Sequence, residues 1–324
     1  MALSLSEQSV GIGLDGILII DKPSGWTSHD VVAKVRRLLG IRKVGHTGTL
    51  DPSATGVLVL CLGKATRIAE YLVLADKAYR ATLRLGVTTD TQDAAGAIVT
   101  RHSGSYPEEQ TIRSVMQACV GITHQVPPMY SAVKVKGMPL YKSARAGRTV
   151  PRVSRPCRIH DIKILSFQRT PTADVVFDVV CSKGTYIRTL CADIGETLGI
   201  GGHLAALERR RVGRFGLEQA LSLEQVAEAV ERNSVQAHVH SLVEALAEMP
   251  AFMLNPLCSE SAGHGTGFSR TGILSTEGNW IRGAPIRLHS PDGRLVAIGK
   301  APWGSGDSTG ANSAAVVTIE KVLV

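Results

Sequence analysis

The chain has 324 residues, 44% of them hydrophobic, and carries 36 lysines and arginines against 28 aspartates and glutamates. A chain of this length can bury a substantial core and divide into two or three domains, and its net charge of +8 favours an anionic partner, nucleic acid before membrane. No apolar run reaches the roughly twenty residues that span a bilayer and no signal peptide precedes residue 15, so we exclude a membrane partner and expect a cytoplasmic protein.

The first predicted helix covers about residues 29–39. Thr27 or Ser28 can cap its start, its valines and leucines share one face, and Gly40 follows its last turn.

The next segment, residues 45–67, places one carboxylate, Asp51, in a loop directly before a continuously apolar strand at 57–62. Gly45 and Gly48 let a ligand approach the backbone closely, and Pro52 fixes the chain after the acid. Functional groups are commonly held in this way, on a loop at the rim of a rigid sheet. Asp-Pro is also common turn chemistry, so the residues alone leave two interpretations of Asp51, a turn residue or a catalytic acid.

Helices and strands alternate over the following part of the chain. Residues 79–85 predict a half-buried strand, because apolar side chains alternate there with arginine and threonine. The other predicted elements are helices over about 65–75, 108–120, 186–198 and 223–232 and strands over about 156–167, 174–181 and 208–215.

Residues 121–152 carry several glycines and prolines and predict a long mobile insertion rather than core. Positive charge gathers in and after this segment. Between residues 134 and 169 the net charge is +9, because one acid, Asp161, stands among ten basic residues: Lys134, Lys136, Lys142, Arg145, Arg148, Arg152, Arg155, Arg158, Lys163 and Arg169. The rest of the chain is near neutral, which indicates a footprint for nucleic acid rather than an evenly solvated surface.

From about residue 250 the composition changes. Glycine, serine and threonine dominate residues 259–278, and residues 283–300 predict two strands joined by a Pro-Asp-Gly turn. The six cysteines form no CxxC pair and predict reduced, buried thiols, and no metal site is predicted.

Six motifs stand in order along the chain: DKPSG at 21–25, GHTGTLDPSATG at 45–56, DKAYR at 76–80, GVTTDTQDAAG at 86–96, PMYSA at 128–132 and CSKGTYIR at 181–188. Together, over about residues 11–215, they resemble the TruB family of tRNA pseudouridine synthases. The ten matching positions around Asp51 make the resemblance highly specific.

The resemblance implies an α+β fold. Its catalytic domain, residues 11–249, would be a mixed, mostly antiparallel sheet with flanking helices and a basic thumb insertion at about 121–152. Residues 250–324 would form a small β-barrel of the PUA type that binds RNA.

The resemblance also implies a reaction, the isomerisation of uridine to pseudouridine at position 55 in the T-loop of tRNA, with the target base extruded into the site. Assistance in tRNA folding is a further implied role. No cofactor, metal or guide RNA is implied, because the GTLDPSATG loop and the long thumb are similar to the bacterial stand-alone form. We expect a monomer that binds the T-arm stem-loop of tRNA.

The roles of the central residues follow from the same resemblance. Asp51 is implied as the catalytic acid, Arg188 as its ion-pair partner, Tyr79 as the ring that stacks on the target base and Leu207 as a pocket residue. Without the motifs, Arg188 would equally suit a surface ion pair, Tyr79 a buried strand position and Leu207 ordinary core.

Other residues are implied in shaping the pocket or binding RNA. His46 resembles the residue that fills the space left by the extruded nucleotide, although a lone histidine is more often structural; Lys22 and Tyr186 would shape the pocket, and Tyr130 would lie on the hinge of the thumb. The remaining predicted RNA contacts are Lys134, Lys136, Arg145, Arg148, Arg152, Arg209 and Arg210.

Two other functions would use some of these features. An RNA-binding chaperone would need the basic insertion but not Asp51, and a base-removing glycosylase would use an aspartate and base extrusion but leave an abasic site. The DKAYR and CSKGTYIR motifs favour the synthase.

Overall fold

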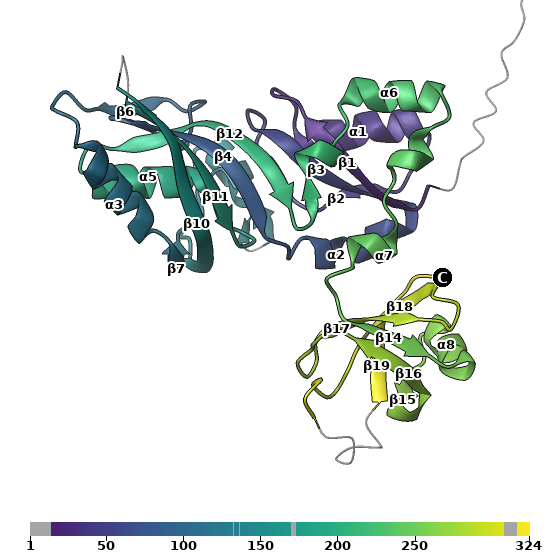
Figure 1. The fold of residues 1–324 in the computed structure, drawn as a ribbon. Helices are drawn as coiled ribbons and strands as arrows, with labels where there is room; N and C mark the ends of the chain where they lie inside the picture. The colour runs from purple at the N-terminus through teal and green to yellow at the C-terminus, as the bar shows by residue number, and fades with distance from the viewer. Residues whose placement is uncertain (1–13, 132, 136, 170–172, 308–315) are drawn as a thin grey trace, which may run out of the picture.

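The computed structural model describes residues 14–131, 133–135, 137–169, 173–307 and 316–324. Two large β-sheets organise this part of the chain (Figure 1). The larger has nine strands, and its main path runs in the order β1-β3-β12-β4-β11-β10-β7, with β2 beside β3 and β13 beside β12. The bounds are β1 Gly16–Lys22, β2 Val44–His46, β3 Thr55–Leu62, β4 Lys77–Leu85, β7 Gly121–Gln125, β10 Arg155–Gln168, β11 Ala173–Cys181, β12 Gly202–Val212 and β13 Phe215–Gly216.

Neighbouring strands on this path are antiparallel with one exception, the parallel pair of β3 and β12. That pair is short: Glu208 lies opposite Thr55, and Arg209 lies opposite Gly56. The predicted mixed, mostly antiparallel sheet is therefore confirmed.

Two groups of helices flank the larger sheet (Figure 1). Helices α1 (Ser28–Leu39) and α6 (Leu223–Glu231) pack over β1 and β3, and their apolar faces join one buried cluster with Leu18 and Leu58. Helices α3 (Glu109–Ala118) and α5 (Ile187–Thr197) belong to a second cluster around Phe177 on the half formed by β4, β11 and β10.

Local sequence signals explain several boundaries. Thr27 caps α1 in a capping box with Asp30, and Gly40 ends the helix with φ of 64°. In β4 the buried positions Ala81, Leu83 and Leu85 alternate with half-buried ones, as the pattern predicts.

Two predicted elements differ from the structure. Residues 65–75 do not form one helix; a 3₁₀ helix over Gly63–Ile68 leads into a single turn, α2 (Ala69–Leu72). The Thr66 hydroxyl donates to the Gly63 carbonyl, a local bond that competes with regular helix bonding. The predicted mobile insertion at 121–152 begins too early, because residues 121–125 form the edge strand β7, which pairs with β10 along Arg155–Ile159. Of these five residues only Gln125 is buried.

The remaining elements of this part are short. They are β5 (Val87–Thr89) paired with β6 (Ile98–Arg101), β8 (Lys134–Val135) paired with β9 (Met138–Pro139), α4 (Leu140–Arg145), and α7 (Leu242–Ala245).

The second sheet has six strands in the order β15-β19-β18-β17-β14-β16. Their bounds are β14 Ala251–Leu254, β15 Phe268–Ser269, β16 Ile273–Glu277, β17 Pro285–His289, β18 Leu295–Lys300 and β19 Val316–Val322, and α8 (Pro256–Gly263) follows β14. The predicted pair of strands joined by Pro-Asp-Gly is confirmed as β17 and β18. Asn255 caps α8 and Pro256 occupies its first turn, so part of the glycine-rich segment is helical.

The two sheets share buried surface. Leu295, Ile298 and Leu323 of the second sheet join the apolar cluster that holds Ile68 and Leu72. Beside this cluster the Arg67 guanidinium donates to the Val322 carbonyl at 2.8 Å, and Lys321 pairs with Glu70 at 2.8 Å. Among the helices in the described ranges, none is long and apolar enough to cross a membrane.

Candidate active site

Asp51 lies on the loop that joins β2 to β3, residues 47–54, and neighbouring segments hold this loop through its backbone. The buried Ser28 hydroxyl donates to the Leu50 carbonyl at 3.2 Å and accepts from the Leu50 N–H at 2.9 Å. The Lys22 ammonium, fully buried, donates to the carbonyls of Pro23, Trp26 and Pro52 at 2.9, 2.7 and 3.2 Å. Burial lowers the pKa of Lys22 to about 8. Lys22 therefore supports the loop from the protein interior rather than facing a substrate.

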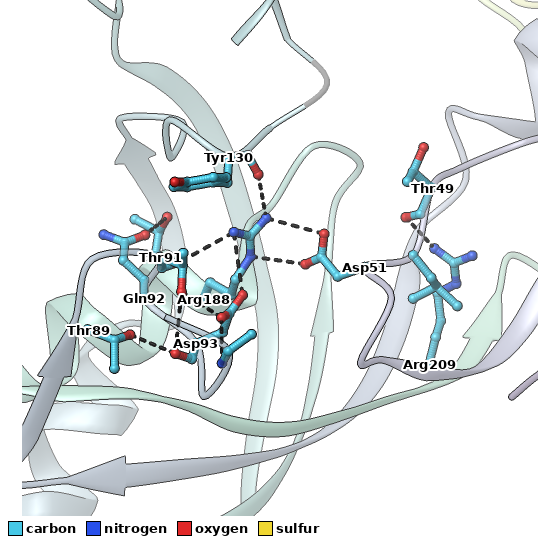
Figure 2. Close-up of polar contacts among 12 residues, drawn as sticks. Thr49, Asp51, Thr89, Thr91, Gln92, Asp93, Tyr130, Arg188 and Arg209 are labelled. Atoms are coloured by element: carbon cyan, nitrogen blue, oxygen red, sulfur yellow. Dashed lines mark hydrogen bonds and ion pairs between the residues drawn. The ribbon is translucent and has the colours of Figure 1, made fainter. Parts of the chain in front are cut away.

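Arg209, from β12, holds the other side of the same loop. Its guanidinium donates to the Val57 carbonyl at 2.7 Å and the Gly48 carbonyl at 3.0 Å. It also donates to the Thr49 carbonyl at 3.4 Å, the contact that Figure 2 shows. Gly56 permits this close packing, because its φ is 96° and a Cβ there would lie 2.3 Å from the Arg209 carbonyl oxygen.

Arg188, near the start of α5, is the centre of a polar network (Figure 2). Its Nε lies 3.0 Å from Asp51 Oδ2 and its Nη2 lies 3.3 Å from Asp51 Oδ1, a two-pronged pair that fixes the plane of the carboxylate. The same guanidinium donates to the carbonyl of Tyr130 at 2.8 Å and to that of Thr91 at 3.3 Å. Arg188 is only 5% exposed, whereas the Asp51 side chain is 37% exposed and open to a ligand.

Asp93 is a site residue that was not predicted. It comes from the loop between β5 and β6, and its Oδ2 lies 3.7 Å from Arg188 Nη1. Its Oδ1 accepts from the Thr91 hydroxyl at 2.6 Å and from the Ala95 N–H at 3.0 Å. The motif GVTTDTQDAAG contains Asp93, so the signal was present, but spacing along the chain gives no hint that this loop reaches Arg188.

The charges around Asp51 act in opposite directions on its pKa. Burial raises the pKa of the Asp51 carboxyl, Arg188 lowers it, Asp93 raises it and Lys22 lowers it, with a net rise above the ordinary value. Two carboxylates thus share one buried guanidinium.

Tyr79 and Leu207 lie on the strands beside this network. In the register of β4 and β12, Tyr79 is opposite Arg209 and Leu207 is opposite Ala81. Burial raises the pKa of the Tyr79 hydroxyl, and both the charge of Arg209 and a hydrogen bond to it oppose that shift. The charge of Asp51 adds to the rise in the pKa of Tyr79.

His46, Tyr130 and Tyr186 surround the same region. His46 ends β2, accepts from the Gly48 N–H at 3.3 Å and stacks edge to face against His29 at 5.4 Å. Burial, helped by His29 and Arg209, lowers the pKa of His46 to about 4, so the ring is neutral at pH 7. Tyr186 precedes α5, where its N–H donates to Gln125 Oε1 at 2.9 Å.

The predicted RNA-binding cations divide into three groups. Arg148 is exposed, Arg152 is half-buried and donates to the Pro127 carbonyl at 3.1 Å, and Arg210 pairs with Glu208 at 2.8 Å on the surface. Lys136 lies outside the described residues, as do the side chains of Lys134 and Arg145. Arg209 is 2% exposed and its donors are bonded inside the protein, so its prediction as an RNA contact is wrong.

Comparisons with known proteins agree with this geometry. The family described as "TruB family pseudouridylate synthase (N terminal domain)" matches residues 36–187, and "tRNA pseudouridylate synthase B C-terminal domain" matches residues 188–250. Similar curated proteins are both named tRNA pseudouridine synthase B: one from Thermobifida fusca is 45% identical, covering 90% of this chain and 96% of its own, and one from Syntrophotalea carbinolica is 44% identical, covering 92% and 95%.

Two solved structures with a similar fold contain Cbf5 and Nop10 by title. A chain in the crystal structure of a Cbf5-Nop10-Gar1 complex has a TM-score of 0.77 and 30% identity, covering 95% of this chain and 85% of its own. A chain of the archaeal box H/ACA sRNP Nop10-Cbf5 complex has a TM-score of 0.73 and 26% identity, with 95% and 86% covered. From its sequence, its sheet and the network around Asp51, the chain belongs to the TruB family of tRNA pseudouridine synthases.

Proposed function

We propose that this chain isomerises uridine to pseudouridine at position 55 in the T-loop of tRNA, with Asp51 as the catalytic carboxylate. The observation that carries the proposal is the bidentate ion pair between the partly exposed Asp51 and the buried Arg188. Its N–O distances are 3.0 Å for Nε to Oδ2 and 3.3 Å for Nη2 to Oδ1. The pair fixes the orientation of the Asp51 carboxylate. Arg209 links the loop that carries Asp51 to β12, where Arg209 lies opposite Tyr79. The names of the relatives, tRNA pseudouridine synthase B, support the substrate class.

The reaction breaks the N1–C1′ bond, turns the uracil and joins C1′ to C5, from which a proton leaves. Three routes begin from an ionised Asp51: attack on C1′, addition to the base, or removal of the C2′ proton. Each of them requires the target nucleotide out of its stack, and a hairpin loop makes that less costly than a duplex. Tyr79 and Leu207 would hold the base, and His46 would occupy the space that it leaves.

RNA recognition is proposed to involve the exposed arginines after residue 145 and the second sheet, which would serve as a PUA-type domain over residues 250–324. We propose a monomer that acts in the cytoplasm without guide RNA, whereas two similar solved structures are complexes of several proteins by title. Assistance in tRNA folding would use the same surfaces without Asp51.

The test is the release of tritium from C5 of the target uridine in a T-arm hairpin. Asp51→Asn should bind the hairpin within several-fold of wild type and release no label, because an amide of the same shape is no nucleophile. Asp178→Asn is the matched control, since Asp178 forms a similar pair with Arg80 at 2.8 and 3.0 Å and its side chain is 38% exposed. Arg80 follows Tyr79 in β4 and points to the opposite face of the sheet.

Each alternative function gives a different product. An abasic site would identify a glycosylase, and unaltered RNA at saturating binding would identify a chaperone. Label release by Asp51→Asn at the wild-type rate would refute the assignment of Asp51.

A further inference from the structure

Arg209 makes a set of contacts that RNA binding does not explain. Its guanidinium is buried and donates to three backbone carbonyls, those of Gly48, Thr49 and Val57. Gly48 and Thr49 lie just before Asp51, and Val57 is the third residue of β3, the strand that follows the loop. One side chain therefore fixes both ends of the loop that carries the carboxylate.

The same guanidinium reaches Tyr79 on the opposite strand. Arg209 and Tyr79 are strand partners across β12 and β4, so their side chains project from the same face of the sheet, and the charge of Arg209 lowers the pKa of the Tyr79 hydroxyl against the effect of burial. On its other side β12 pairs with β3, where Arg209 lies opposite Gly56. Arg209 thus lies between two strands: β3, which follows the Asp51 loop, and β4, which carries Tyr79.

A buried arginine of this kind is costly unless every donor is used. Desolvation lowers the pKa of Arg209, and Tyr79 and Asp51 act against that shift. A neutral donor could bind the same carbonyls without the desolvation cost of a buried charge. The presence of an arginine therefore indicates that its charge acts on another group in the site.

We propose that Arg209 is a positioning residue that holds the Asp51 loop, places its charge beside Tyr79 on the neighbouring strand and stabilises the Tyr79 phenolate during C5 proton removal. This inference rests on the proposed function. The phenol first loses its own proton to solvent; the C5–H bond then breaks, its electron pair returns to the ring, and the proton passes to the Tyr79 oxygen.

The groups that face Tyr79 determine the sign of its response to pH. Burial raises the pKa of Tyr79, Arg209 from β12 lowers it, and Cys181 from β11 and Asp51 from the loop raise it. Removing the Arg209 charge leaves only groups that raise the pKa, so the phenolate would form at higher pH.

The experiment measures single-turnover tritium release between pH 6 and 10 for Arg209→Gln and Arg209→Lys, each with Tyr79 and with Tyr79→Phe. We expect Arg209→Gln to slow release at neutral pH by roughly tenfold or more and to move the alkaline rise in rate to higher pH. Arg209→Lys, which keeps the charge, should lose less. In the Tyr79→Phe background the alkaline rise should vanish and Arg209→Gln should cost less than it does alone, because the two changes remove one interaction.

Arg287→Gln is the matched control. Arg287 is also a buried arginine whose guanidinium donates to backbone carbonyls, those of Met249 at 2.8 Å and Ala247 at 3.3 Å, but it lies in the second sheet. This variant should lower the melting temperature and leave the pH profile unchanged. If Arg209→Gln fails to fold, the comparison of Arg209→Lys with Tyr79→Phe still tests the coupling.

Two outcomes would overturn the inference. In the first, Arg209→Gln leaves the pH profile unchanged and lowers the rate by the same factor with Tyr79 as with Tyr79→Phe. Arg209 would then have a structural role only. A decrease of the salt dependence of RNA binding in Arg209→Lys or Arg209→Gln would return it to RNA contact. The proposed function fails separately, if the wild type releases no label or Asp51→Asn releases it normally.

Discussion

Two buried guanidinium groups lie beside Asp51, and they differ in what they bind. Arg188 faces the carboxylates of Asp51 and Asp93, which together exceed its charge, whereas Arg209 is bonded mainly to neutral carbonyls. An ion pair with one buried partner is sensitive to the loss of the other partner, because the buried charge is left uncompensated. Substitutions at Arg188 and Asp93 should therefore alter the ionisation of Asp51 in opposite directions.

The first prediction concerns this pair of neighbours. Arg188→Gln removes the charge that lowers the pKa of Asp51, so the acid limb of the pH–rate profile should move to higher pH, with the rate at pH 7 falling roughly a hundredfold. Asp93→Asn removes a charge that raises the same pKa, so its acid limb should move to lower pH. Tritium release across pH 4 to 8 measures both, and limbs that move in the same direction would contradict the assignment of charges.

The second prediction concerns Lys22, whose pKa is lowered by burial to about 8. Between about pH 8 and the unfolded value near 10.4, the unfolded chain binds more protons at this residue than the folded chain, so Lys22 makes stability rise with pH. Lys22→Met removes that contribution, and its deficit in unfolding free energy should grow by up to about 1.4 kcal/mol per pH unit in this window. Denaturant titrations at pH 7 and pH 10 test it; an equal deficit at both would show that Lys22 titrates normally.

At the scale of elements, β12 is the strand on which the site depends. It is the partner of β3 on one side and β4 on the other, and the parallel contact with β3 requires Gly56 opposite Arg209. A Cβ at Gly56 would contact the Arg209 backbone, which cannot move aside as a flexible side chain could.

Gly56→Ala tests that contact against a glycine of similar conformation. Gly40 has φ of 64° and a Cβ there would meet nothing within 4 Å, so Gly40→Ala should cost about 1–2 kcal/mol from backbone strain alone. Gly56→Ala should cost more than this and slow catalysis, because β3 must move away from Arg209 and carry the Asp51 loop with it. Denaturation and tritium release measure the two effects, and equal losses for both variants would mean that the strands adapt freely.

The same elements show how far sequence carries. Helix α1 and strand β4 follow from signals within a few residues, the Thr27 cap and the alternation from Ala81 to Leu85. The pairing of Asp51 with Arg188 was predicted only through the family resemblance, since 137 residues separate the two. Asp93 and the inward orientation of Arg209 were missed because strand order and register decide them, and periodicity does not reveal which strands meet. The α2 region was overpredicted as one helix because apolar spacing outweighed a local side-chain bond.

For the whole molecule, the net charge of +8 is unevenly distributed, since residues 134–169 alone carry +9. Such a distribution steers an anionic partner toward one region and makes binding depend on salt. The two sheets share an apolar cluster, so removing residues 250–324 would also expose core, and single substitutions are the cleaner test of RNA contacts.

Arg148→Ala should weaken T-arm binding and reduce the slope of log K against log salt by about 0.9, the value for one lost phosphate contact. Arg152→Ala should have a smaller effect on the slope, because its guanidinium is engaged with the Pro127 carbonyl. Arg232→Ala makes the same change of charge at the residue that follows α6, where the side chain is 76% exposed, and should leave the slope as in wild type. Equal slopes for all three variants would mean that Arg148 and Arg152 of the insertion at 121–152 do not contact phosphates.

The wide separation of the site residues along the chain has a consequence for the order of events in folding. Arg188 closes onto Asp51 across 137 residues, and Arg209 reaches the Gly48 carbonyl across 161. Loops of this length close slowly, and no contact near Asp51 in sequence can substitute for them. A growing chain therefore has its carboxylate long before it has a site, and catalytic competence cannot precede the emergence of residue 209. During refolding, catalytic activity should therefore return late, after the strands of the large sheet have all paired.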